Sequence, residues 1–311
     1  MKNEKLKILI IFSTLCLIWG STWGMIRLGL ESLTPLMSLG LRFALASILI
    51  FVVMKFRNIS IQMDKVSVRL YIVMGFGSFV VPFGLVYWAE QFVPSGLSAV
   101  LFAVYPFFVV LFSYLAIPSE VIGFYKIFGI ILAFTGIFTI FYDGLTIDIS
   151  LYIWGMSAII LSGIMQAGIA VTLKKYGHHL HPLSMNFIPL LIAGISLVII
   201  GLIAEDTTKL IFDSKAFISI IYLAAIGTVL TFTSYYWLLK RVSVVMLSLI
   251  AFITPIVALI IGWIFFHENL SYRVLFGSIL VLLGLLIANF RSFIKLRDHK
   301  FLGNTSSQRL Q

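Results

Sequence analysis

The sequence contains few charged residues. Aspartate, glutamate, lysine and arginine make up only 11% of its 311 residues, whereas hydrophobic residues make up 61%, and the mean hydropathy is +1.10. A chain of this composition would expose far too much apolar surface to fold in water. We therefore predict that its solvent is a lipid bilayer.

Other absences exclude several classes of protein. Cys16 is the only cysteine, so neither a disulfide framework nor a cysteine-rich metal site is available. The chain has no G-x-S-x-G, no complete H-E-x-x-H and no G-x-x-x-x-G-K-[ST] motif, which argues against an enzyme and against a nucleotide-driven pump. The histidines of the 178–181 loop lack a thiol or close carboxylate to complete a metal site. We expect no enzyme activity, no cofactor and no metal.

Apolar runs of about 20 residues, the length that spans a bilayer as a helix, follow one another along the chain. Ten can be drawn, at 8–28, 35–54, 69–89, 94–116, 124–142, 151–173, 182–204, 216–239, 243–266 and 272–290. Helices satisfy their backbone hydrogen bonds internally, and the weak alternation of a transmembrane barrel is absent. The sequence predicts an all-α polytopic membrane protein with ten transmembrane helices.

The basic residues predict the topology. Although 22 lysines and arginines outnumber 12 acidic residues, they lie in short clusters between the apolar runs, which does not indicate nucleic-acid binding. With a cytoplasmic N-terminus, 17 basic residues fall on the cytoplasmic side and 4 on the outside, with Arg42 inside a span. The first run lacks a clear cleavage site and is expected to remain as a span. We predict a plasma (inner) membrane location with both termini cytoplasmic.

One pattern of landmarks occurs twice. Its first copy contains Tyr87-Trp88, Pro106, Glu120, Gly129 and Gly136, and its second, 148 or 149 residues later, contains Tyr236-Trp237, Pro255, Glu268, Gly277 and Gly284. Because each copy holds five spans, an odd number, the second copy is inverted relative to the first. Inverted repeats in a membrane indicate a transporter.

Several stretches resemble a known family. They are Trp19-Gly20-Ser21-Thr22-Trp23-Gly24, the segment from Pro35 to Arg42-Phe43, and the Pro106 to Glu120 and Pro255 to Glu268 segments. Together they resemble the two EamA-type repeats of the drug/metabolite transporter superfamily. The resemblance implies a ten-helix secondary transporter for small metabolites, often an exporter of amino acids. The expected division is 1–145 and 146–292 for the two five-helix repeats, with a disordered cytoplasmic tail at 293–311.

Pro106 and Pro255 lie near the middle of their spans, where a proline removes a helix hydrogen bond. We expect both helices to be kinked or locally opened at the bilayer midplane. Interrupted helices at matching places in two repeats predict a central substrate site, with Tyr105 and Thr254 beside it. A packing kink without a ligand is the alternative.

Some polar residues occur in only one copy and are candidates for specificity. Arg42 stands where the second copy has Pro189, and Glu90 stands where it has Leu239. These two residues predict either an ion pair near the outer surface or a group that contacts substrate or protons. Gln166, which replaces Trp19 in the second copy, predicts a hydrogen bond either to substrate or to another helix.

Aromatic residues complete the predicted site. Trp19 and Trp23 are four residues apart and share one face of the first helix. With Tyr87, Tyr105 and Tyr235 they predict a lining that stacks on flat apolar groups or holds a cation, although tryptophan and tyrosine also collect at membrane interfaces. The full predicted substrate-binding set is Trp19, Trp23, Arg42, Tyr87, Glu90, Tyr105, Gln166, Tyr235 and Thr254.

The remaining matched residues predict support for the scaffold. Glu120 and Glu268 lie in short turns and are expected to cap the helix that follows or to support a gate. The paired glycines predict close helix packing, and the fifth span of each repeat is expected to serve packing or a homodimer. We predict an alternating-access exporter of small zwitterionic or aromatic metabolites, with proton coupling left open. A channel and a permease for quaternary amines or drugs are the alternatives, and a membrane-embedded enzyme is the least favoured.

Overall fold

The computed structural model describes residues 2–116, 123–144, 150–177, 179–239, 241–242 and 244–288, and all regular structure in these residues is helical. The α-helices are α1 (Lys2–Leu30), α2 (Pro35–Phe56), α3 (Lys65–Met74), α4 (Val81–Ala89), α5 (Ser95–Phe102), α6 (Tyr105–Ala116), α7 (Phe124–Gly144), α8 (Ser150–Tyr176), α9 (Ser184–Ala204), α10 (Ser214–Ile221), α11 (Thr231–Leu239), α12 (Val244–Phe266) and α13 (Tyr272–Ala288). Two π-helical segments, η1 (Gly75–Val80) and η3 (Tyr222–Leu230), and a 3-10 turn, η2 (Thr207–Lys209), complete the elements.

The helices confirm the predicted fold class. Eight stretches are long and apolar enough to cross a membrane, and two shorter apolar helices follow, at 250–266 and 272–288. The third span consists of α3, η1 and α4, the fourth of α5 and α6, and the eighth of α10, η3 and α11. Large apolar side chains such as Phe138 and Ile203 point outward, 71% and 82% exposed, as suits contact with lipid. The chain is an integral membrane protein of ten helices arranged as two inverted five-helix repeats.

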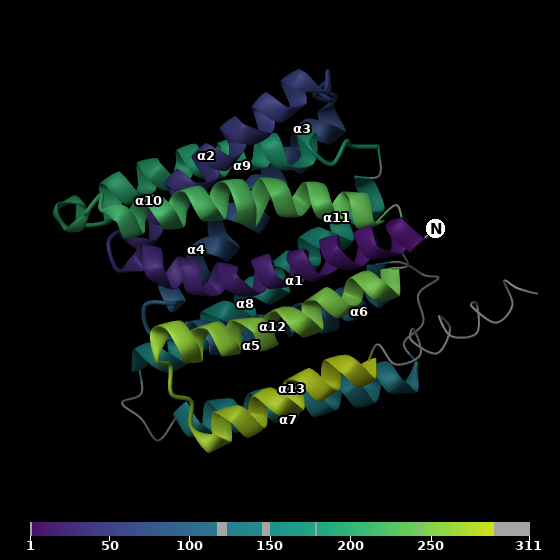
Figure 1. Cartoon of the computed structure of the whole chain (residues 1–311), viewed down its shortest axis with the longest axis vertical. Coiled ribbons are helices and arrows are strands. Elements are labelled where there is room, and N and C mark those ends of the chain that lie inside the picture. The colour runs from purple at the N-terminus through teal and green to yellow at the C-terminus, as the bar shows by residue number, and fades with distance from the viewer. Residues whose placement is uncertain are drawn as a thin grey trace, which may run out of the picture.

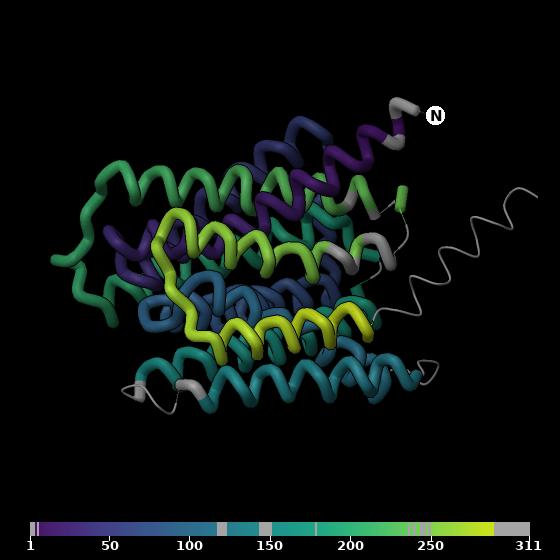
Figure 2. The backbone as a smooth tube through the Cα atoms, turned by 60° about the horizontal axis from the view of Figure 1, so that its bottom comes forward, coloured from purple at the N-terminus to yellow at the C-terminus, as the bar shows by residue number. Residues whose placement is uncertain are grey.

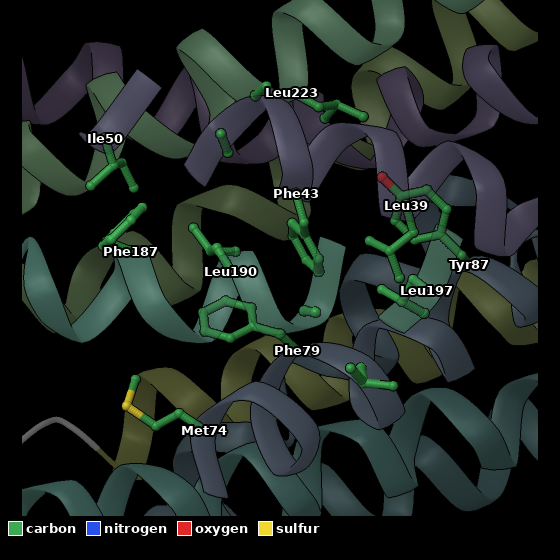
Figure 3. Packing of buried hydrophobic residues seen from close by; sticks show 14 of the residues in the cluster. Leu39, Phe43, Ile50, Met74, Phe79, Tyr87, Phe187, Leu190, Leu197 and Leu223 are labelled. Carbon is green, nitrogen blue, oxygen red and sulfur yellow. The ribbon is translucent and has the colours of Figure 1, made fainter. Parts of the chain in front are cut away.

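Helices of the first repeat pack mainly on helices of the second. α2 lies against α9, α7 against α13, α4 against α8, and α1 and α5 both against α12. Figure 1 shows the α7 and α13 pair at one edge of the bundle and α2 and α9 towards the other. The tube in Figure 2 shows the same lengthwise packing from another side. One large buried cluster includes residues of α2 and α9, where Phe43 packs with Leu190 (Figure 3).

Glycines bring α7 and α13 into close contact. A Cβ on Gly277 would lie 2.7 Å from the carbonyl oxygen of Gly136, and one on Gly284 would lie 2.5 Å from that of Gly129. No larger side chain fits at these separations, so backbone meets backbone along the pair. The paired glycines therefore serve helix packing, as the sequence predicts.

The two matched prolines lie in different surroundings. α5 ends at Phe102 and α6 begins at Tyr105, so the fourth span is interrupted just before Pro106. α12 instead continues through Pro255 without a break. α12 packs against both α1 and α5, and we attribute its continuity to these contacts, which outweigh the single hydrogen bond that the proline removes. A local opening is present in the first copy only.

Both repeats contain a π-helical segment in the third span. In η1 the cause is Pro82, which has no N–H and whose ring would clash with the carbonyl of Ser78 in a regular α-helix. η3 has no such proline. There the Thr228 hydroxyl donates a hydrogen bond of 2.8 Å to the carbonyl of Leu223, five residues back. This bond gives a carbonyl of the widened turn a hydrogen-bond partner. The segments occupy corresponding places in the two copies.

Candidate functional site

The two ends of the bundle carry different loops. We call the clamp end the one that carries loops 31–34, 90–94, 205–213 and 267–271, at the left of Figure 1. The terminus end carries the N-terminus and loops 57–64 and 177–183, at the right of Figure 1. The candidate site residues lie between these ends and at the clamp end.

An aromatic cluster joins the two repeats between the ends of the bundle. We define it as Trp19 and Trp23 of α1, Phe102 of α5, Tyr105 of α6 and Tyr235 of α11, all half-buried. The ring centroids of Trp19 and Tyr235 are 5.7 Å apart, and those of Trp23 and Phe102 are 5.6 Å apart. Phe102 and Tyr105 stack at 6.0 Å with their planes only 4° apart, and Tyr105 and Tyr235 interact electrostatically.

The structure thus brings together four of the predicted aromatic residues and adds Phe102. The signal for Phe102 in the sequence is its place immediately before the break that Pro106 causes. Thr254 also lies nearby in the fold, because its carbonyl oxygen is 3.0 Å from a Cβ built on Gly20, the neighbour of Trp19. Aromatic rings of this kind can stack on a flat apolar group or attract an organic cation.

Polar bonds link each π-helical segment to the first helix of the other repeat. Ser78 of η1 donates to Oε1 of Gln166 on α8 at 3.3 Å. Ser21 of α1 and Tyr222 of η3 share a hydrogen bond of 2.6 Å. Of the two interpretations of Gln166, the structure contains the bond between helices. The sequence pattern gave no sign of the bond between Ser21 and Tyr222, because neither residue has a matching residue in the other copy.

Arg42 is almost fully buried, with 5% of its surface exposed. Its Nη1 donates a hydrogen bond of 3.1 Å to the hydroxyl of Tyr87, which is itself completely buried in the core of Figure 3. Its guanidinium carbon lies 5.4 Å from the ring centroid of Phe43 and 5.6 Å from that of Phe83. Two aromatic faces and one hydroxyl therefore accommodate the charge, in place of a carboxylate.

Glu90 is the first residue after the third span and is completely buried. Neither carboxylate oxygen has a hydrogen-bond partner in the described part of the chain, and within the same residues no ion pair joins Glu90 to Arg42. Instead, Nη1 of Arg27 donates to the main-chain carbonyl of Glu90 at 2.6 Å. The sequence pattern gave Arg27 only a role in topology, because it lies at the end of the first span.

Burial is the main influence on the Glu90 carboxyl. It raises the pKa of Glu90 well above the usual value, and the nearby carboxylate of Glu268 raises it further. Arg27 and, more weakly, Arg42 act in the opposite direction and lower this pKa. Glu90 is therefore disposed to carry a proton in this conformation.

Two other carboxylates clamp helix N-termini across the repeats. The oxygens of Glu268 accept hydrogen bonds from the backbone N–H groups of Ser95 at 2.7 Å and Gly96 at 3.0 Å, at the start of α5. Those of Glu205 accept from Leu36 at 2.8 Å and Met37 at 3.1 Å, at the start of α2. We call these contacts the two clamps. A carboxylate at a helix N-terminus pairs free N–H groups and complements the helix dipole.

The expectation that Glu268 caps the helix that follows it was wrong. Its carboxylate caps α5, while α13 receives its cap from Ser271, whose hydroxyl accepts from the N–H of Val274 at 3.1 Å. The turn before α13 therefore already has a capping group, which leaves Glu268 for the other repeat. The expectation for Glu120 lies outside the described residues, as does that for His178.

Comparisons with known proteins agree with this architecture. The family model described as EamA-like transporter family matches residues 6–142 and 153–290. The chain is 31% identical over 282 residues to the uncharacterized inner membrane transporter YedA of Escherichia coli, which covers 87% of this chain and 89% of that protein. It is 25% identical over 285 residues to the uncharacterized transporter YoaV of Bacillus subtilis, covering 91% and 97%.

A likeness to a solved structure supports the same fold. One crystal structure superposes with a TM-score of 0.66, covering 91% of this chain and 96% of that chain at 14% identity, which speaks for the fold alone. The family model matches both halves of the chain, and the fold contains both five-helix repeats. The chain therefore belongs to the EamA-like transporter family.

Proposed function

We propose that this protein is a secondary transporter that exports small neutral or zwitterionic metabolites carrying a flat apolar group, such as aromatic amino acids. The observation that carries the proposal is the aromatic cluster, in which α1 and α5–α6 of the first repeat meet α11 of the second. Membership of the EamA-like transporter family indicates that the protein transports a small molecule across a membrane. The aromatic cluster is the basis for proposing a substrate that carries a flat apolar group.

The charges near the cluster limit the substrate. Aromatic rings favour stacking on flat groups, and their faces also attract cations. Among the residues that the structure describes, Arg42 is the single arginine or lysine buried within a span, and its Nη1 is already bonded to Tyr87. An organophosphate would require several cationic groups to bind its oxygens. A small amino or carboxylate group on an otherwise apolar molecule fits this environment better.

The mechanism we propose is rocking of one repeat against the other around the aromatic cluster, which exposes it to each side in turn. The distribution of basic residues supports an outward-facing clamp end and a cytoplasmic terminus end. The relative YedA is named as an inner membrane transporter, which supports the plasma membrane as the location. In this conformation both clamps are formed, so the outer end is closed.

The test is counterflow in proteoliposomes that contain the purified full chain. Radiolabelled aromatic amino acids, quaternary amines and nucleosides are screened with and without a pH gradient. We expect saturable counterflow of an aromatic amino acid, and about a tenfold weaker half-saturation in Trp19→Ala and in Tyr105→Ala, because each loses one stacking face. Trp263→Ala is the matched control, since Trp263 is 66% exposed on the lipid side.

Three results would contradict the proposal. Fast flux without counterflow would indicate a channel rather than alternating access. Saturation by quaternary amines alone would favour a cation permease. Equal loss of affinity in Trp19→Ala and Trp263→Ala would mean that the cluster contributes only to packing.

A further inference from the structure

We propose that Glu90 is a proton-binding site whose protonation is coupled to closure of the clamp end, so that export is driven by protons entering from the outside. This inference rests on the transport function proposed above and deepens it. Glu90 has no counterpart in the second repeat, where Leu239 stands in the corresponding place. The site is therefore single in each chain, as a coupling site requires.

The first argument is the burial of Glu90 without a partner. Its exposed fraction is 0%, and neither oxygen accepts a hydrogen bond within the described residues. An ionised carboxylate in such a place loses its hydration and gains little in return. The neutral acid avoids most of this cost. By contrast, Glu205 and Glu268 each accept two backbone hydrogen bonds.

The second argument is the set of groups that surround Glu90. Glu268 of the 267–271 loop, Arg27 of α1, Arg42 of α2 and Tyr87 of α4 are the charged and titratable groups that interact with it in the described part of the chain. The two arginines make ionisation possible when the site opens to water. Glu268 opposes ionisation of Glu90, because two negative charges this close repel each other.

The third argument connects Glu90 to the clamp. Glu90 follows α4 directly, and only loop 91–94 separates it from α5, whose first residues Ser95 and Gly96 are held by Glu268. Closing the clamp therefore brings two carboxyl groups together in a buried place. Closure with both groups ionised places like charges side by side, whereas closure with Glu90 protonated does not.

Linkage then gives the direction of coupling. A ligand shifts a conformational equilibrium only by its difference in affinity between the two states. The buried site of the closed clamp end binds the proton more tightly than an open, hydrated site does. A proton taken up from the outside therefore favours outer closure. Its loss to the cytoplasmic side leaves Glu90 ionised beside Glu268, which favours reopening of the clamp end. The covalent change is one O–H bond formed at Glu90 and later broken.

The direct test is an infrared titration of the full chain, labelled with carbon-13 glutamate and reconstituted in phosphatidylethanolamine and phosphatidylglycerol vesicles. We expect one carboxyl to titrate at a pH above the usual range of glutamate. This component should be missing in Glu90→Gln and present in the matched control Glu205→Gln. A spectrum unchanged by Glu90→Gln would overturn the proposal.

Two further variants retain Glu90, so the proposal can be tested even if Glu90→Gln does not fold. Glu268→Gln removes a negative neighbour and should move the titration down by about one pH unit, whereas Arg27→Gln removes a positive neighbour and should move it up by about as much. These opposite shifts are not expected from a residue that serves packing alone. Absence of both shifts would overturn the proposal.

The transport arm uses radiolabelled L-tryptophan as the probe. In the wild-type protein we expect a pH gradient that is acidic on the outside to change the rate of tryptophan counterflow severalfold. In Glu90→Gln the remaining rate of counterflow should be the same at each pH. A Glu90→Gln rate that still follows pH would count against the coupling. Absence of tryptophan counterflow in the wild type would contradict the proposed substrate, while the infrared titration would still decide whether Glu90 binds the proton.

Discussion

The two ends of the bundle hold the repeats together with different chemistry. At the clamp end, Glu205 and Glu268 bind backbone N–H groups at 2.7 to 3.1 Å. At the terminus end, the described contacts between repeats include a bond of 2.9 Å from Ser184 to Gln62 and one of 3.0 Å between Ser67 and His179. His179 also lies 4.0 Å from the carboxylate of Asp64, and the ammonium group of Lys7 lies 5.3 Å from the ring centroid of Trp237. Hydrogen bonds to ionised groups are roughly twice as strong as bonds between neutral groups.

This difference shows which end is the more firmly closed. Opening the clamp end separates two carboxylates from helix N-termini, whose N–H groups then need water as a replacement partner. Opening the terminus end exchanges hydroxyl and amide bonds for bonds to water, with little net cost. The charged contacts there, His179 with Asp64 and Lys7 with Trp237, involve side chains exposed to water, where such contacts contribute little. We infer that the conformation described above is the one closed at the clamp end. Variants that weaken each end separately can test this comparison.

The largest effect is expected from Glu268→Ala. It removes both acceptors of the α5 clamp and leaves the buried N–H groups of Ser95 and Gly96 without partners, at a cost of about 3 kcal/mol. The unfolding midpoint in detergent should fall. A cysteine placed at the buried Ser98 in a Cys16→Ser background should react faster with an impermeant thiol reagent added from outside.

Glu31→Ala is the matched control for this variant. Glu31 also links the repeats at the clamp end, through an ion pair of 2.5 Å with Lys215, but both side chains are exposed to water. Exposed ion pairs contribute about 0 to 1 kcal/mol. If Glu31→Ala accelerates labelling as much as Glu268→Ala, the backbone clamp is not what closes this end.

A somewhat smaller effect is expected from Glu205→Ala. Glu205 accepts from two N–H groups at the start of α2, but Leu36 is only half-buried, so water reaches its N–H more easily than those of buried Ser95 and Gly96. We expect a loss of about 2 kcal/mol in the free energy of unfolding. The double variant with Glu268→Ala sharpens the comparison. If the clamps close one gate, the effects of the two substitutions on labelling at Ser98 should not be additive.

The sequence predicted the parts of this fold that depend on composition and spacing. Hydropathy located the spans because the bilayer imposes a length. The duplicated glycines predicted close helix packing, although not that α7 and α13 would pack on each other. The partner of Glu268 could not be predicted in this way. The carboxylate oxygens of Glu268 accept from backbone N–H groups, which every residue except proline carries. No side chain in the first repeat therefore identifies the residues that Glu268 binds.

The candidate site was predictable to a similar extent. Spacing on α1 and the break at Pro106 pointed to Trp19, Trp23 and Tyr105. Arg27 was missed because a basic residue at a span end is usually a topology signal, and its bond goes to the main chain of Glu90. The π-helical segments were missed because η3 contains no proline to announce it.

At the terminus end we expect a smaller effect, from Gln62→Ala. This change removes one neutral bond between the repeats, while Ser184 keeps its bond of 2.9 Å to the carbonyl of His181. The expected cost is about 1 kcal/mol, measured by the same unfolding midpoint. Gln91→Ala is the control, since exposed Gln91 bonds only to Trp88 of its own repeat among the described contacts. A cost for Gln62→Ala equal to that of Glu268→Ala would remove the distinction between the ends.

The smallest effects are expected from Asp64→Ala and Asp213→Ala, which are matched helix caps at opposite ends. Asp64 caps α3 at the terminus end, and the Ser67 hydroxyl is the main cause of its lowered pKa. Asp213 caps α10 at the clamp end, and the N–H of Ala216 is the main cause of its lowered pKa. Both carboxylates are exposed, so solvent weakens their contribution.

The sign of the pH dependence follows from these lowered pKa values. Because each folded pKa lies below the usual aspartate value of 3.8, the stabilisation is fully present at neutral pH and is lost as the pH falls through the folded pKa. The unfolding midpoint of each variant should therefore approach that of the wild type on acidification below 3.8. Similar shifts for both variants at neutral pH would show that local caps are alike at the two ends. A much larger shift for Asp213→Ala would mean that capping, rather than the contacts of Glu205 and Glu268 across the repeats, makes the clamp end the firmer one.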